Sequence, residues 1–183
     1  MTGAAESGGP PRAAMIAALV LAVATIGAIL VLAATRHPRQ QPVTLPAVAA
    51  PHAASPACNA LIDALPEQLG SFRRAEIAQP APESARAWRS VNNAEPVIMR
   101  CGLERPDEFV VGSPIQVVDT VQWFRVGDRG STDAGTTTWY TVDRPVYVAL
   151  TLPTGSGPVP IQDLSRIIDR TVTAVPIDPA PAR

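Results

Sequence analysis

The strongest constraint on this chain is an uninterrupted apolar segment near its N-terminus. Residues 13–34 contain no charged, proline or amide side chain. A helix rises about 1.5 Å per residue, so this segment spans roughly 33 Å, enough to cross a hydrocarbon core of about 30 Å. The segment therefore predicts a transmembrane helix that separates a short N-terminal tail, residues 1–12, from the rest of the chain.

Three interpretations of the apolar segment remain open. A secretory signal has an apolar region of about 7–15 residues, so the greater length here favours an uncleaved anchor. The segment runs through Val31-Leu32-Ala33, which a signal peptidase tolerates, so a cleaved signal is the second interpretation. The third is a core helix of a soluble domain, although such a helix normally has a polar face and this segment has none.

The orientation of the predicted helix depends on two conflicting signals. Basic residues favour the cytoplasmic side, and Arg36 and Arg39 follow the helix whereas Arg12 precedes it. The chain beyond the helix, however, carries two isolated cysteines, a pattern typical of oxidising compartments. We give the cysteines more weight and predict a single-pass plasma-membrane protein whose C-terminal domain lies outside the cytoplasm.

Composition divides the rest of the chain into three parts. Residues 35–56 contain five prolines among Ala, Val and Gln, which predicts an extended linker. Residues 57–175 have the length of one domain, with 11 Arg, no Lys and 14 acidic residues. This mildly acidic balance gives the domain no electrostatic reason to bind nucleic acid. The proline-rich tail, residues 176–183, is predicted to be disordered.

The domain has helical patterns at both ends and β-prone runs between them. Ser55-Pro56 predicts a capped helix that ends at Leu65-Pro66, and residues 158–175 predict a second amphipathic helix. The expected strands are residues 97–101, 115–126, 136–142 and 146–152, the last two forming a hairpin through Asp143-Arg144-Pro145. We predict an α+β domain in which two helices pack on one face of an antiparallel sheet.

The two cysteines, Cys58 and Cys101, predict one disulfide that joins the first helix to the first clear strand. A redox pair or two unrelated free thiols are the alternatives. The chain has no Cys-x-x-Cys motif, and two distant cysteines without a neighbouring histidine make a poor metal site. We therefore interpret the pair as structural.

The residues needed for most enzyme chemistry are scarce. His37 and His52 both lie in the predicted linker and there is no lysine, which argues against histidine-activated nucleophiles and Schiff-base chemistry. Carboxylates are the remaining acid–base candidates: Asp119, Asp143 and the loop residues Glu104, Asp107 and Glu108. We predict no catalytic residue, no cofactor and no metal site.

The aromatic residues offer a candidate interaction surface. Trp139 and Tyr140 are neighbours on a predicted strand, so one side chain faces the core and the other faces outward. Arg144 follows in the hairpin turn. Core and sheet packing is one interpretation of Trp139, Tyr140 and Arg144, and a partner-binding surface is the other.

Several segments, taken in order, resemble a known family. They are the apolar helix, the Cys58 helix, Arg100-Cys101-Gly102, Val121-Gln122-Trp123, the run from Trp139 to Arg144, and Tyr147-Val148-Ala149-Leu150. Together they are similar to an actinobacterial domain-of-unknown-function family, number 3515. The resemblance implies a membrane-anchored or secreted envelope protein and supplies no catalytic residues.

These observations favour a membrane-anchored extracytoplasmic protein with a non-enzymatic binding or accessory domain. Its expected partners are the lipid bilayer, through the helix, and an envelope protein or cell-wall component. The alternative is a carboxylate-dependent envelope enzyme that acts on cell-wall material, and a structural spacer is a third interpretation.

We expect residues 13–34 to remain in the mature protein, because their length exceeds the apolar core of a signal peptide. Mass spectrometry of the protein purified from its own membrane should find the tail 1–12 still attached. A mature N-terminus near Ala34 would instead identify a cleaved signal and a secreted domain.

Overall fold

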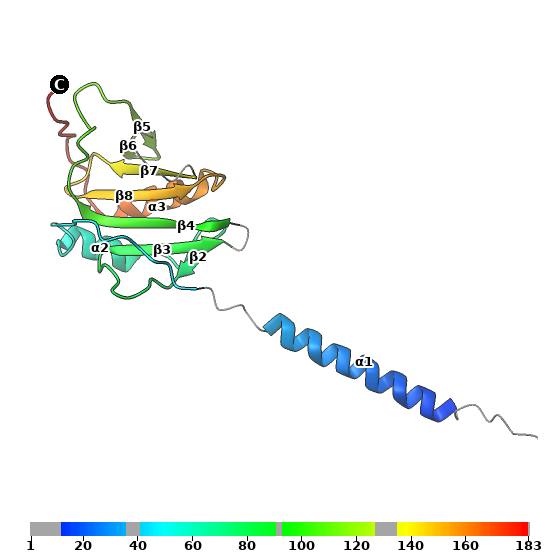
Figure 1. Ribbon diagram of the computed structural model, residues 1–183. Coiled ribbons are helices and arrows are strands. Elements are labelled where there is room, and N and C mark those ends of the chain that lie inside the picture. Colours follow the sequence, from blue (N-terminus) through cyan, green and yellow to red (C-terminus); the bar gives the residue numbers. More distant parts are fainter. Residues whose placement is uncertain (1–11, 36–40, 91–92, 127–134, 183) are drawn as a thin grey trace, which may run out of the picture. The chain divides into compact units, whose positions relative to one another are not determined.

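The computed structural model describes residues 12–35, 41–90, 93–126 and 135–182, and the chain divides into two compact units, the second starting at Gln41. The first unit contains helix α1 (Arg12–Thr35; Figure 1). Its portion Arg12–Leu32 is long and apolar enough to cross a membrane, as a membrane anchor or a signal sequence would be. None of that portion is buried within the protein, whereas a core helix of a soluble domain buries one face.

The second unit is built on one eight-stranded antiparallel sheet, which confirms the predicted α+β class. The strands lie side by side in the order β1-β2-β3-β4-β8-β7-β6-β5. The strands are β1 (Gln68–Leu69), β2 (Phe72–Ala75), β3 (Ala85–Ser90), β4 (Asn93–Leu103), β5 (Ile115–Val118), β6 (Val121–Arg125), β7 (Thr136–Thr141) and β8 (Tyr147–Pro153).

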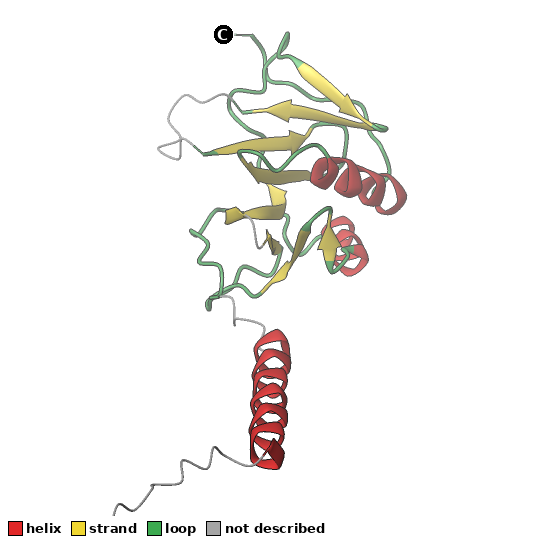
Figure 2. Cartoon of the chain, turned by 90° about the vertical axis from the view of Figure 1, so that its right-hand side faces the viewer, coloured by secondary structure: helices red, strands yellow, loops and turns green. Residues whose placement is uncertain are grey.

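Helices α2 (Pro56–Ala64) and α3 (Val159–Thr171) lie on the same side of this sheet (Figure 2). The main core fills the space between them and the strands, and it draws large apolar side chains from every strand from β1 to β4 and from β6 and β8. Burying each such side chain stabilises the fold by about 1.5–3 kcal/mol. Its fully buried members include Leu61, Leu69, Trp88, Met99, Trp123, Leu150, Leu164 and Ile168.

The start of α2 is fixed by a cap and by the disulfide. The Ser55 hydroxyl accepts a hydrogen bond from the backbone N–H of Cys58 at 3.3 Å, and Pro56 occupies the first turn. Cys58 and Cys101 are joined by a disulfide whose Cα atoms are 5.6 Å apart, and both residues are completely buried. The bond therefore ties α2 directly to β4.

Gly102 explains how the chain before α2 approaches the disulfide so closely. Its φ is +82°, and a Cβ atom at this position would lie 2.4 Å from the backbone nitrogen of Ala53. The carbonyl of Gly102 also accepts a hydrogen bond from the N–H of His52 at 3.0 Å. Only glycine combines this backbone conformation with this contact.

The predicted strand 115–126 is wrong, because these residues form the β5–β6 hairpin instead of one long strand. The turn is made by Asp119 and Thr120, and Asp119 adopts a φ of +52°. Aspartate tolerates this left-handed region better than most residues. β-Prone residues on both sides of Asp119 and Thr120 made the segment resemble one long strand, and the sequence did not predict strands β1, β2 and β3.

Two segments predicted to lie outside the domain contact it. Val43, in the expected linker, is 2% exposed, and its N–H and carbonyl bond to Glu76 and Ala78. In the expected disordered tail, Ala180 exchanges two backbone hydrogen bonds with Phe109 and Val111. In both cases backbone hydrogen bonds hold the segment against the domain despite its proline-rich composition, and burial of the Val43 side chain adds to this at the first segment.

Removing the disulfide should destabilise the domain. Cys58 and Cys101 are 43 positions apart, and cross-links of this kind contribute about 2–4 kcal/mol to the free energy of unfolding. The full-length Cys58→Ala/Cys101→Ala variant in lipid nanodiscs should lose about that amount in chemical denaturation. Wild-type protein held in excess reductant is the matched control and should fall to a similar stability; no loss in either sample would contradict a stabilising role.

Candidate functional site

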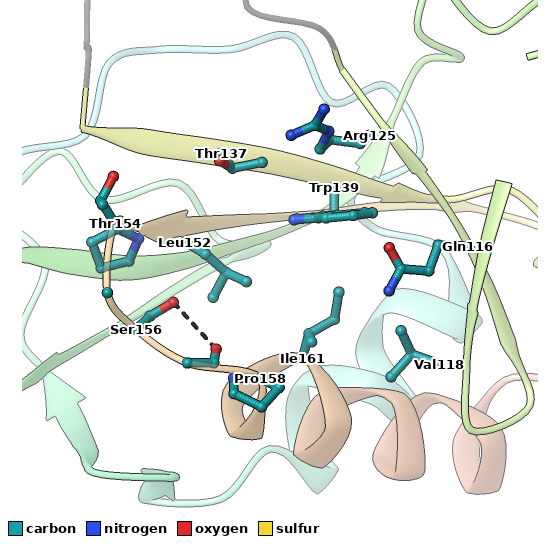
Figure 3. Close-up of a pocket in the computed structure, with 13 residues that line it drawn as sticks. Gln116, Val118, Arg125, Thr137, Trp139, Leu152, Thr154, Ser156, Pro158 and Ile161 are labelled. Atoms are coloured by element: carbon teal, nitrogen blue, oxygen red, sulfur yellow. Dashed lines mark hydrogen bonds between the residues drawn. The ribbon is translucent and has the colours of Figure 1, made fainter. Parts of the chain in front are cut away.

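The helix-covered face of the sheet has a groove beside the beginning of α3. The cavity has a volume of about 390 Å³, and its walls come from β5, β6, β7 and β8, the β8–α3 loop 153–158 and the first turn of α3 (Figure 3). This volume lies within the range of about 300–1,000 Å³ that small-molecule sites occupy. The groove is therefore large enough to hold a ligand.

Trp139 is the largest side chain in the groove. It pairs with Arg125 on β6 and with Leu150 on β8, so strand alternation directs it to the helix-covered face. Trp123 lies on the same face but is fully buried, and its indole N–H donates to the Ser165 hydroxyl of α3 at 2.9 Å. Trp139 lies outside the part of the sheet that α3 covers and is only half-buried.

Apolar and polar side chains converge around Trp139. Figure 3 shows the indole edge-on, with Leu152 and Ile161 on one side of its plane and Arg125 on the other. Gln116 approaches from β5, and its side chain is exposed, as is that of Arg125. The indole N–H of Trp139 has no hydrogen-bond partner among the residues that the structure describes. The groove thus joins an aromatic surface to free donors and acceptors.

The β8–α3 loop, which closes one side of the groove, is held by hydrogen bonds to Gly135 and by bonds within the loop. The Thr154 N–H and hydroxyl both donate to the carbonyl of Gly135, at 2.7 and 3.0 Å. The Ser156 N–H donates to the carbonyl of Pro153, and the Ser156 hydroxyl donates to that of Gly157. The loop is therefore largely formed before any ligand arrives, which lowers the entropic cost of binding.

A second cavity of about 670 Å³ lies next to the groove at β5 and β6. The two cavities share Gln116, Arg125 and Trp139, and the second adds Pro114, Ile115 and Val117. A molecule longer than one ring can therefore contact Trp139 and extend toward the β5 edge.

The structure separates Tyr140 from Trp139. Tyr140 pairs with Ala149 and Phe124 and so lies on the opposite face of the sheet. Burial raises the pKa of the Tyr140 phenol, partly offset by the nearby Arg100 guanidinium, so it stays neutral at physiological pH. It does not line the Trp139 groove.

Arg144 is buried and does not contribute to an exposed surface. It is 4% exposed, and its Nη1 and Nη2 atoms lie 2.9 Å from Asp143 Oδ2 and 3.4 Å from Asp169 Oδ1. Asp143 Oδ2 also accepts the N–H of Gln122 at 3.1 Å. Burial raises the pKa of the Asp143 carboxyl, an effect that the Gln122 N–H and the Arg144 guanidinium reduce. This cluster ties the β7–β8 turn to β6 and α3.

The remaining acidic candidates are dispersed over the surface. Asp119 is exposed at the β5–β6 turn, and Glu104, Asp107 and Glu108 are exposed in the loop after β4. No three His, Cys, Asp or Glu side chains in the described part of the chain gather closely enough to hold a metal ion. His52, which belongs to the second unit and not to a free linker, is exposed as well.

A comparison of the sequence with protein-family models identifies the family of this chain. The family model described as protein of unknown function (DUF3515) matches residues 19–177, most of the chain. The chain belongs to this family. No curated protein and no solved structure matches it. The DUF3515 match therefore covers α1 from residue 19 onward and nearly all of the second unit, without supplying an activity.

Sequence reasoning identified Trp139 but missed the rest of the groove in this DUF3515 protein. Arg125 and Gln116 come beside Trp139 through the β5–β6 hairpin, which the sequence pattern concealed. The segment Gly155-Ser156-Gly157-Pro158, which connects β8 to α3, forms one wall of the groove. Strand pairing, and not local composition, brings these residues together.

Breaking the buried ion pair should unfold the DUF3515 domain more readily. Arg144→Met leaves Asp143 buried without its cation, and loss of one partner of a buried pair costs about 3–5 kcal/mol. Asp143→Asn/Arg144→Met should recover part of that loss because no charge remains buried. Chemical denaturation of the full-length variants measures both effects.

Asp119→Asn is the control for this ion-pair prediction, because Asp119 is exposed and asparagine also tolerates a positive φ. Its free energy of unfolding should change by no more than about 0.5 kcal/mol. A double variant that loses as much as, or more than, Arg144→Met would show that the charge pairing is not the stabilising feature.

Proposed function

We propose that this protein is anchored in the plasma membrane by α1 and presents a non-enzymatic binding domain outside the cytoplasm, in the envelope of an actinobacterium. The observation that carries the proposal is the buried Cys58–Cys101 disulfide in the unit that follows an apolar helix. Structural disulfides persist in oxidising compartments and are rare in the cytosol. The disulfide therefore supports an extracytoplasmic position for the domain.

The charge distribution near α1 does not by itself favour this orientation. Arg36 and Arg39 after the helix outnumber Arg12 before it, which favours a cytoplasmic C-terminal side. The tail 1–12 is short, however, and remains in the cytoplasm without a translocation step. A cytoplasmic domain would also leave a buried disulfide in a reducing compartment, so we give the disulfide more weight.

The chemistry of the groove supports binding in preference to catalysis. Its described lining supplies an indole, an amide, a guanidinium and hydroxyls, but no carboxylate or imidazole. General acid–base catalysis requires a group that exchanges a proton near the working pH, within hydrogen-bonding reach of the substrate. Asp143 and Asp119 do not line this groove, so the observed side chains are suited to holding a ligand.

Cysteine accessibility tests the proposed topology. In a Cys58→Ala/Cys101→Ala background, Thr154→Cys marks the exposed β8–α3 loop and Ser7→Cys marks the N-terminal tail. A membrane-impermeant maleimide applied to intact cells should label Thr154→Cys and not Ser7→Cys. After lysis both should react, which controls for thiol reactivity.

Two outcomes would contradict the topology. Labelling of Ser7→Cys but not Thr154→Cys in intact cells places the domain in the cytoplasm. Recovery of the Thr154→Cys protein from the culture medium, without its N-terminal tail, shows that the domain is secreted and not anchored.

A further inference from the structure

We propose that the Trp139 groove binds an oligosaccharide of β-linked 2-acetamido-gluco-configured sugars, stacking one pyranose ring on the indole. This inference deepens the proposed function, because it names the ligand class of the same binding domain. It rests on four properties of the groove: an accessible aromatic ring, a ring of neutral and cationic polar groups, a small apolar floor, and an extended shape.

The first property is the accessible indole. A gluco-configured pyranose ring has its hydroxyls around the edge and its C–H bonds on the two faces, so each face is apolar. Such a face matches the flat, electron-rich surface of an indole in size and polarity. Trp139 is half-buried and stands against open space, whereas Trp88 and Trp123 are both fully enclosed.

The second property is the arrangement of polar groups around that ring. The Gln116 amide both donates and accepts, Arg125 offers several donors, and the Thr137 hydroxyl does either. Sugar hydroxyls also donate and accept, so they pair with all three. No acidic side chain lies among the described lining residues, which disfavours a cationic ligand.

The third property selects the acetamido group. Leu152 and Ile161 line the same cavity as Gln116 and form a small apolar surface (Figure 3). An acetamido substituent has a methyl group, which gains from leaving water against such a surface. Its amide N–H and C=O pair reciprocally with the primary amide of Gln116. A sugar with only hydroxyls satisfies the polar groups but leaves the apolar surface without a complement.

The fourth property is the length of the groove. The Trp139 cavity of about 390 Å³ shares three lining residues with the cavity of about 670 Å³ at β5 and β6. A single sugar occupies only part of this space. Gln116, Arg125 and Trp139 line both cavities, so a chain of rings that contacts them with one ring has room for a further ring.

A peptide that adds a strand at the outer edge of β5, the last strand in the order of the described sheet, is the competing occupant. Such a peptide obtains its affinity from the backbone N–H and C=O groups of the edge strand. Trp139 lies two strands away from that edge, in the order β7-β6-β5. Binding through the edge is therefore insensitive to the Trp139 ring, and stacking depends on it.

The test uses the full-length protein in nanodiscs of phosphatidylcholine and phosphatidylglycerol, with no sugar-based detergent. Chitotriose is the probe, and cellotriose has the same β-linked rings without acetamido groups. Saturation-transfer NMR and tryptophan fluorescence report binding. We expect chitotriose to bind, and cellotriose to bind at least about tenfold more weakly, which corresponds to about 1.4 kcal/mol.

Variants then assign the site. Trp139→Ala should weaken chitotriose binding at least about tenfold, and Gln116→Ala, whose exposed side chain does not support the core, should weaken it about threefold or more. Tyr140→Ala is the matched control, because it removes the adjacent aromatic residue from the same strand but on the opposite face; its affinity should be unchanged. Melting temperatures confirm that each variant is folded.

Three results would each overturn the glycan proposal: no chitotriose binding at millimolar concentration, equal affinity for cellotriose, or full affinity in both Trp139→Ala and Gln116→Ala. Binding of an extended peptide that Trp139→Ala leaves intact, with no chitotriose binding, would assign the surface to the β5 edge. None of these binding results depends on which side of the membrane the domain lies. The cysteine-labelling experiment therefore tests the proposed topology independently of the glycan proposal.

Discussion

The burial of one sheet face beneath two short helices determines most of this structure. Helices α2 and α3 cover the core residues of β1 to β4, β6 and β8, and this burial supplies the main stabilising free energy. Eight strands, however, present more surface than these helices cover. Trp123, whose indole N–H bonds to Ser165 of α3, lies beneath the helices, whereas Trp139 lies outside the part of the sheet that they cover. The groove exists because the cover is incomplete at the beginning of α3.

The boundary of that cover is held by polar contacts and by the disulfide. Arg144 joins Asp143 in the β7–β8 turn to Asp169 of α3, and so fixes α3 relative to the strand that carries Trp139. The disulfide fixes α2 to β4 in the same way, and Gly102 allows the chain at His52 and Ala53 to pass beside it. Both helices are thus fixed to the sheet by specific contacts as well as by apolar packing.

The sequence predicted the features that depend on local pattern. The Ser55 cap, the apolar face of α3 and the hairpin through Asp143 follow from residue spacing, and the α+β class follows from their order. Prediction from the sequence failed where pairing between distant segments overrides the local composition. The β5–β6 turn lies between two β-prone segments that resemble one long strand, and Val43 is buried although the composition around it predicts a linker. Such contacts join residues far apart in the sequence, which periodicity does not register.

The candidate interaction surface of Trp139, Tyr140 and Arg144 shows the same limit of prediction from sequence, at single residues. Strand alternation predicted that Trp139 and Tyr140 face opposite sides, and they do. The sequence also grouped Arg144 with them because it is near in the chain, but its guanidinium is buried between two carboxylates. The exposed cation beside Trp139 is Arg125, which reaches it across a strand pair. An arginine that stabilises the fold and an arginine available to a ligand thus differ in their tertiary partners, which closeness in the sequence does not reveal.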